Sequence, residues 1–377
     1  MKKIVAINGA FFQPKGGGIK EYIENLINQL CSLNSNIEII FYVLQDHYDY
    51  AKNNLPTNLK IKKIPFNSGS KFNRIKRSLL ERNFWLKEEK KENFSLFHSP
   101  FFHAPKLKRS KLLLTVHDLR LYRFPKTYEF FRYQFLKRKV RNSLKRADHI
   151  ISISDFTKKE IMELCNVSAD KISVVHEAIN RDKFSDKSIK DPQDISMELK
   201  NYPFLLAVGH MEPRKNYDRL IAAYINLTKH PVLKDLRLVI VGKKDHSYKE
   251  TLKRIEETPG VIYLNFVSGN SLLWLYKNAK LFVFPSYYEG FGFPPLEAAS
   301  LGTISAVSNV SSVPEICGDA AFYFNPYDID EMTATIKKAL TDPKAIKDMQ
   351  SRLQDNLNKF SWERNAKATL NIYQQMI

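Results

Sequence analysis

Two glutamates flank a glycine-bearing loop at residues 289–297, which read Glu-Gly-Phe-Gly-Phe-Pro-Pro-Leu-Glu. The loop follows an apolar run typical of a buried parallel strand and leads straight into a helical segment. Backbone N–H groups of Gly292 and Phe293, with the positive end of that helix, can face an anion. Glu289 and Glu297 can accept hydrogen bonds from hydroxyl groups on either side of it. This spacing suits a sugar nucleotide, although a strand, a loop and a charged helix start also produce it.

Other candidate groups follow predicted strands. Arg214 and Lys215 come after the apolar run 204–208, where two cations could clamp a diphosphate or simply lie on a solvated loop. His117 ends another strand and could bind a sugar, transfer a proton or serve a structural role. Three glycines, Gly16, Gly17 and Gly18, allow close approach to a phosphate, but they equally fit a turn and do not match a dinucleotide fingerprint.

No pattern in the sequence indicates a metal site. Asp328 and Asp330 match a metal-binding Asp-x-Asp, but they stand at a predicted helix start, where aspartate is favoured as a cap. The three cysteines are widely spaced and odd in number, which is typical of reduced thiols in a cytosolic protein. The N-terminal apolar stretch is interrupted at Asn8 and Gly9 and predicts a strand rather than a signal peptide. No run reaches the roughly 18 apolar residues of a membrane span.

The positive charge is concentrated in one part of the chain. The net charge is +19, and residues 51–150 hold 26 Lys/Arg against 7 Asp/Glu, whereas the rest of the chain is balanced. Segments 71–86 and 132–146 interleave cations with apolar residues at helical spacing. Such segments suit an anionic membrane surface, although a solvated charged face over a core gives the same pattern.

Strand-like and helical runs alternate along the 377 residues, which predicts an α/β fold with two doubly wound, Rossmann-like domains facing across a cleft. Strands are expected at 3–7, 37–44, 112–115, 149–153, 171–175, 204–208, 236–241, 261–266, 281–285 and 303–306. The expected domains are 1–182 for the acceptor and 203–359 for the nucleotide sugar. A linker is expected at 183–202, and the helix in 360–377 is expected to cross back to the first domain.

Together these segments resemble the retaining glycosyltransferases of the GT-B fold, family 4, and in particular its group 1 mannosyltransferases. The matching segments are 16–18, 116–119, 147–155, 209–216, 284–298, 308–315, 319–326 and 360–363. The resemblance implies hexose transfer from a nucleotide-diphospho-sugar to a saccharide hydroxyl, without a divalent metal or other cofactor. The chain departs from many members at His210, where they carry arginine, and this substitution suggests a pH-dependent donor affinity.

The resemblance also implies roles for individual residues. His117, Glu289, Lys215 and Arg214 would be catalytic, with His117 near the reacting carbon and the two cations on the diphosphate. Glu297 would hold the ribose, Phe266 and Val267 would border the nucleobase, and the glycines 16–18 would close over the diphosphate. The donor sugar and distal phosphate would be held by Glu289 with Gly290, Phe291, Gly292 and Phe293.

The resemblance leaves the donor and the setting open. GDP-mannose is preferred, with UDP-, dTDP- and GDP-fucose-type donors as alternatives. The expected acceptor is lipid-linked, in surface polysaccharide synthesis such as O-antigen, and the enzyme is expected in the cytoplasm, peripheral at the inner face of the cell membrane. Rival interpretations are an epimerase or phosphorylase of the same architecture, an inactive sugar-binding homologue, and a basic nucleic-acid-binding protein, for which the aromatic residues give no binding signature.

Overall fold

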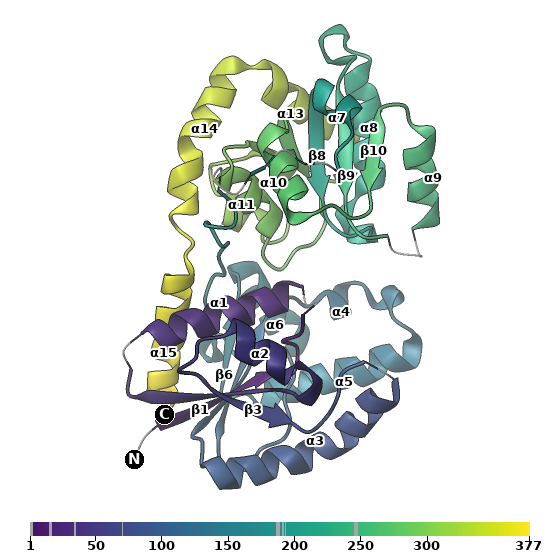
Figure 1. Cartoon of the computed structure of the whole chain (residues 1–377). Helices are drawn as coiled ribbons and strands as arrows, with labels where there is room; N and C mark the ends of the chain where they lie inside the picture. Colours follow the sequence, from purple (N-terminus) through teal and green to yellow (C-terminus); the bar gives the residue numbers. More distant parts are fainter. Residues whose placement is uncertain are drawn as a thin grey trace. The chain divides into compact units, whose positions relative to one another are not determined.

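The computed structural model describes residues 3–14, 17–33, 35–69, 71–185, 189–190, 192, 194–244 and 248–377 (Figure 1). Side chains of residues 71–79 and 197–198 lie outside this description, as does Gly16, one of the predicted phosphate-loop glycines. The chain forms two compact units. One comprises Met1–Glu177 with Ser361–Ile377, and the other comprises Ala178–Phe360.

In the first unit, the described residues form a parallel sheet in the order β3-β2-β1-β4-β5-β6-β7. Its inner strands are apolar because both faces are covered, and Val5, Ala6 and Ile7 of β1 are almost fully buried. The outermost strand β3 carries three lysines and is partly exposed. The strands are β1 (Lys3–Gly9), β2 (Ile37–Leu44), β3 (Lys60–Ile64), β4 (Leu96–Ser99), β5 (Lys111–Val116), β6 (His149–Ser152) and β7 (Ile172–Val174).

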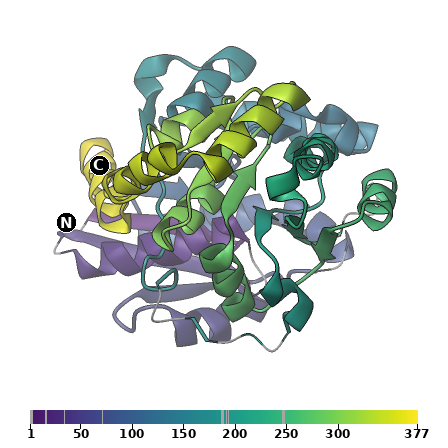
Figure 2. The same ribbon diagram turned by 90° about the horizontal axis from the view of Figure 1, so that it is seen from above.

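The helices of this unit pack on both sides of the sheet. They are α1 (Gly18–Ser32), α2 (Tyr48–Asn54), α3 (Lys71–Glu92), α4 (Arg120–Arg123), α5 (Phe130–Arg146), α6 (Asp155–Cys165) and α15 (Trp362–Met376). Trp85 of α3 fills the core against Tyr42 and Phe97, with ring centroids 4.9 and 4.7 Å away. Figures 1 and 2 both show α15, in yellow, beside the purple α1.

The second unit holds a parallel sheet, within the described residues, in the order β10-β9-β8-β11-β12-β13. Its strands are β8 (Phe204–Val208), β9 (Arg237–Val241), β10 (Val261–Leu264), β11 (Leu281–Phe284), β12 (Ser305–Ser308) and β13 (Phe322–Phe324). Its helices are α7 (Met197–Asn201), α8 (Tyr217–Thr228), α9 (Lys249–Glu257), α10 (Gly269–Asn278), α11 (Phe293–Ser300), α12 (Val313–Cys317), α13 (Ile329–Thr341) and α14 (Pro343–Leu357). Both sheets have the strand order of a doubly wound fold, as predicted.

The structure differs from two of the predictions and agrees with a third. In segment 183–202, expected as a linker, the described residues Phe184, Ile195 and Leu199 are buried in the core of the second unit. The strand expected at 261–266 ends at Leu264, and the side chain of Phe266 is 87% exposed. Asp328 caps α13 as predicted, since its carboxylate accepts the N–H groups of residues 330 and 331.

Candidate active site

The strand order of the second sheet reverses between β8 and β11. Ligands of doubly wound sheets bind outside the carboxyl ends of the strands at such a point. The loop after β8 carries Arg214 and Lys215, and the loop after β11 carries Glu289. The fold therefore brings together three of the residues predicted to be catalytic.

Glu289 lies between the two cations. One carboxylate oxygen, Oε2, is 2.7 Å from Nη1 of Arg214, and the other, Oε1, is 2.7 Å from Nζ of Lys215. Arg214 also donates through Nε to Glu212 at 2.7 Å and through Nη1 to the carbonyl of Tyr288 at 3.0 Å. The geometry of the guanidinium is thus fixed from two loops at once.

Charge and burial act in opposite directions at this cluster. Burial raises the pKa of Glu289, but the nearby Lys215 and Arg214 outweigh it and hold that pKa at about 2. Burial lowers the pKa of Arg214, yet Glu289 and Glu212 outweigh it, so the pKa is raised. For Lys215, which is 6% exposed, burial prevails over the attraction of Glu289 and the pKa is lowered.

Gly209 makes room for the side chain of Lys215, and Gly242 makes room for the backbone of Gly209. A Cβ atom on Gly209 would lie 2.8 Å from Cε of Lys215, and a Cβ atom on Gly242 would lie 1.8 Å from the carbonyl oxygen of Gly209. Asn216 fixes the turn that follows, since it has φ 58° and its amide donates to the carbonyls of Pro285 and Pro326 at 3.1 and 2.8 Å. The cation-bearing loop is therefore tied to the loop that carries Glu289.

The loop from Glu289 to α11 is fixed by two serines. Ser312 donates to the carbonyls of Glu289 and Phe291 at 2.9 and 2.7 Å, and Ser311 accepts the N–H of Glu289 at 3.2 Å. These contacts hold the loop residues Gly290 to Gly292 ahead of the helix, which begins at Phe293. Gly292, with φ 117°, precedes the first residue of α11.

Glu297 lies on the first turns of α11, where Tyr276 of α10 donates to its Oε2 at 2.7 Å. Tyr276 is fully buried, so this hydrogen bond fixes the carboxylate from the interior side. Val267 packs against the core of the second unit, whereas the neighbouring Phe266 is largely exposed. Sequence reasoning missed Tyr276, since no local pattern links it to Glu297.

The first unit places His117 directly after β5. Its Nδ1 is 2.9 Å from Oε1 of Glu177, and its Nε2 is 3.2 Å from the carbonyl oxygen of Pro100. Both neighbours are hydrogen-bond acceptors, an arrangement that favours the ring with hydrogen on both nitrogens. Burial lowers the pKa of His117, but Glu177 outweighs it and the pKa is raised. The ring packs edge-on against Tyr22 at 4.9 Å.

The remaining predicted site residues, Gly17, Gly18 and His210, make fewer defined contacts. Gly17 and Gly18 lie at the start of α1, Gly17 as its N-terminal cap residue without a side-chain hydrogen bond. His210 is exposed, and its pKa is lowered by desolvation despite the nearby Glu212. Its charge therefore changes below its ordinary range, which moves the expected pH dependence of donor affinity to more acidic pH.

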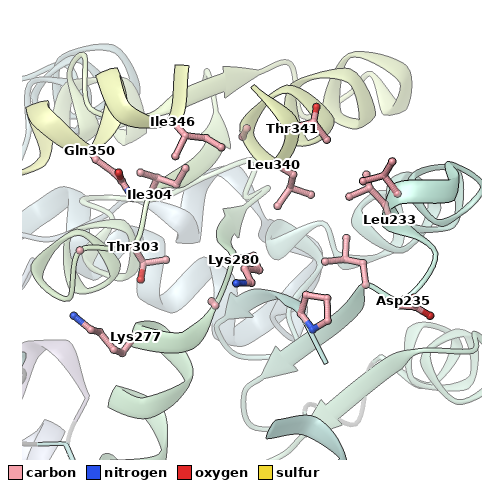
Figure 3. Close-up of a pocket in the computed structure, with 16 residues that line it drawn as sticks. Leu233, Asp235, Lys277, Lys280, Thr303, Ile304, Leu340, Thr341, Ile346 and Gln350 are labelled. Atoms are coloured by element: carbon pink, nitrogen blue, oxygen red, sulfur yellow. The ribbon is translucent and has the colours of Figure 1, made fainter. Parts of the chain in front are cut away.

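A separate pocket of about 490 Å³ opens at the opposite end of the strands of the second sheet (Figure 3). The pocket is lined by the residues that directly precede three strands: Pro203 before β8, Lys280 before β11 and Ile304 before β12. Leu340 and Ile346 complete the lining. Because the strands are parallel, this pocket lies at their amino ends, away from Glu289. It is distinct from the predicted donor site.

Comparisons with known proteins cover both units. The family model described as glycosyl transferases group 1 matches residues 190–359, and that of glycosyltransferase family 4 matches residues 16–183. The chain is 32% identical over 289 residues to O-antigen chain mannosyltransferase B of Escherichia coli, covering 74% of each protein. It is also 32% identical over 236 residues to O-antigen chain mannosyltransferase RfbU of Salmonella typhimurium, covering 62% of each.

A solved structure shows the same fold over the whole chain. Sucrose-phosphate synthase of Thermosynechococcus elongatus superposes with a TM-score of 0.75 over 99% of both chains, at 17% sequence identity. At that identity the likeness concerns the fold alone, which is GT-B.

Proposed function

Because the chain belongs to the group 1, family 4 glycosyltransferases, we propose that it transfers mannose from GDP-mannose to a hydroxyl of a saccharide acceptor. The observation that carries this proposal is the Arg214–Glu289–Lys215 cluster at the reversal of the second sheet. The mannosyltransferase names of its relatives favour a mannosyl donor. Their O-antigen names favour a lipid-linked acceptor in surface polysaccharide synthesis.

The donor diphosphate would take the place of Glu289 as partner of the two cations. The Arg214 fork and the Lys215 ammonium would then face the phosphate oxygens, with the loop 290–293 and the start of α11 beside them. Glu289, freed from its cations, would accept hydrogen bonds from the sugar hydroxyls. Glu297, already fixed by Tyr276, would accept those of the ribose.

Transfer breaks the bond between the anomeric carbon and the phosphate oxygen and forms one to the acceptor oxygen. Negative charge grows on the leaving diphosphate, so cations already in position stabilise the transition state more than the ground state. The acceptor proton passes to the leaving phosphate, and attack from the same face retains the anomeric configuration, as in this family. To donate a hydrogen bond near the reacting carbon, His117 would have to exchange the carbonyl of Pro100, the partner of its Nε2, for an oxygen of the sugar, while Glu177 keeps hold of Nδ1.

The first test is a thermal-shift titration against GDP, UDP, dTDP and their hexose conjugates, with EDTA present. A ligand at about 100 times its dissociation constant adds about 2.7 kcal/mol to the free energy of unfolding. We expect GDP and GDP-mannose to raise the melting temperature, and mannose transfer to continue in EDTA. A response to UDP or dTDP alone would mean that the donor carries that nucleotide instead of GDP. Loss of activity in EDTA would contradict metal-independence.

The membrane setting is supported by α5. Its Phe130, Phe131 and Phe135 are 67, 85 and 58% exposed, on a helix that carries seven Lys/Arg and no acid. Exposed aromatic rings among cations suit the surface of an anionic membrane. Within the described residues, no helix is both long and apolar enough to span a bilayer.

Vesicle co-sedimentation tests this peripheral association. We expect binding to phosphatidylglycerol vesicles, weak binding to neutral phosphatidylcholine vesicles, and loss of binding in Phe131→Ser. Equal recovery of wild type and Phe131→Ser with anionic vesicles would contradict a role for α5. A mobility shift with DNA but none with anionic vesicles would revive the nucleic-acid interpretation.

A further inference from the structure

Glu177 is a buried acid that no predicted role accounts for. The residue is 1% exposed, and within the part of the chain that the structure describes its carboxylate has one hydrogen-bond and ion-pair partner, Nδ1 of His117 at 2.9 Å. A carboxylate is costly to remove from water unless a positive group accompanies it. The pair therefore favours the charged form of the imidazole.

Glu177 reaches His117 through the sheet and not through the local sequence. His117 follows β5, and Glu177 follows β7, 60 positions later. The backbone that carries Glu177 is held from two sides. The N–H of Val175 donates to the carbonyl of the last residue of β6 at 2.9 Å, and Asn365 of α15 donates to the carbonyl of His176 at 2.8 Å. The carboxylate is thus held in a fixed position beside the imidazole.

The other ionisable groups around His117 have smaller effects on its charge. Burial lowers the pKa of His117, Glu177 raises it more strongly, and the neighbouring Asp118 adds a smaller increase. Burial and the charge of His117 lower the pKa of His98 to about 3, so His98 stays neutral. Tyr22, packed edge-on against the ring, also stays neutral because burial raises its pKa. Glu177 is therefore the main group that keeps the imidazole charged.

We propose that Glu177 is a positioning residue that orients the imidazole of His117 and keeps it positively charged during turnover. The inference rests on the proposed function, in which Nε2 exchanges the carbonyl of Pro100 for an oxygen of the sugar. A neutral ring that donates from Nδ1 to Glu177 would present a lone pair at Nε2. Loss of the proton at high pH would therefore turn Nε2 from a donor into an acceptor and stop its contribution.

Glu177→Gln tests the pairing, since glutamine keeps the size of the side chain and still accepts from Nδ1 but carries no charge. The readout is the ¹⁵N shift of the His117 ring nitrogens in the full chain from pH 5.5 to 9, assigned by the signal missing in His117→Asn. We expect the wild-type ring to stay charged to higher pH than free histidine, and the ring in Glu177→Gln to lose its charge at lower pH. Glu160→Gln is the matched control, because Glu160 is also 1% exposed in the first unit but pairs with Arg123.

Turnover should follow the same titration. With GDP-mannose as donor and methyl α-mannoside as acceptor, the ratio of turnover at pH 6 to turnover at pH 8 should be about tenfold larger in Glu177→Gln than in the wild type. The reason is that removing one neighbouring charge moves such a midpoint by about one pH unit or more. Glu177→Asp restores the charge on a shorter side chain and should recover part of the wild-type pH profile. The affinity for GDP should stay unchanged in both variants.

A purely structural role for Glu177 predicts a different result. A lower melting temperature in Glu177→Gln with an unchanged His117 titration overturns the proposal. A wild-type His117 that loses its charge at the pH of free histidine or below also overturns it, and this measurement needs no variant to fold. A wild type that responds to no nucleotide defeats the proposed function instead, while the ring titration still reports on the pairing.

Discussion

Lys215 and Glu289 are 74 positions apart in the chain, yet Nζ and Oε1 lie 2.7 Å apart. The pairing exists because β8 and β11 are neighbours in the sheet, so the loops that follow them meet. Nζ of Lys215 also lies 4.8 Å from the centre of the Phe284 ring, at the end of β11. The predicted diphosphate clamp is therefore occupied by a protein carboxylate in this structure.

Lys215→Met should weaken donor use more than it weakens the fold. Losing one member of a buried charge pair costs about 2–5 kcal/mol, but here Arg214 still neutralises Glu289. We expect at least a tenfold rise in the dissociation constant for GDP, measured by titration calorimetry. The matched Arg214→Lys keeps the charge but loses the fork, so a wild-type affinity in both variants would refute the clamp.

Glu289 should make stability sensitive to acid. Its folded pKa of about 2 lies below the ordinary 4.5, so its contribution to stability is complete above pH 4.5 and is lost as the pH falls towards 2. The difference in melting temperature between wild type and Glu289→Gln should therefore shrink between pH 5 and pH 3. Glu257→Gln, whose side chain is 64% exposed, is the control and should show little pH-dependent difference.

His117 should make the protein less stable as the pH rises, which is the opposite of the effect of Glu289. Its folded pKa is raised above 6.5, so its contribution to stability is present below pH 6.5 and is lost as the pH rises through the folded value. Heating scans from pH 6 to 9 should show a steeper loss for the wild type than for His117→Asn. His117→Ala should also reduce turnover, and near-wild-type turnover would overturn its assigned role.

Gly242→Ala should be more disruptive than Gly209→Ala. A methyl group on Gly242 meets backbone at 1.8 Å, whereas one on Gly209 meets the Lys215 side chain at 2.8 Å. We expect Gly242→Ala to unfold at much lower urea concentration, and Gly209→Ala to lose GDP affinity first. Gly269→Ala, with open space around it, should be within about 1 kcal/mol of wild type.

Tyr276→Phe should loosen Glu297 without disturbing the core. The hydroxyl donates to Oε2 of Glu297 at 2.7 Å, and its loss removes one hydrogen bond to a charged group, about 1.5–3 kcal/mol. We expect the GDP dissociation constant to rise about tenfold, while that for inorganic diphosphate stays unchanged. An equal loss for both ligands would place the effect elsewhere than at the ribose.

Sequence patterns predicted much of this fold because buried parallel strands are continuous apolar runs. The predicted strands at 37–44 and 204–208 agree with β2 and β8 to the residue. The pattern was uninformative at 183–202, where polar and charged residues outnumber apolar ones, so the buried Ile195 and Leu199 give too short a signal to indicate a packed segment. Partners such as Glu177 and Tyr276 could not be predicted, since each reaches its site only through tertiary packing.

The position of α15 has a consequence for how the chain folds as it is synthesised. Tyr373 gives His98 a hydroxyl partner 2.7 Å from Nδ1, and Asn365 donates to the carbonyl of His176 at 2.8 Å. Tyr373 and Asn365 leave the ribosome only after all of residues 178–360 have been made. The first sheet must therefore wait, with one side incomplete, through the synthesis of an entire second sheet, and the apolar surface that α15 later covers stays exposed during that interval.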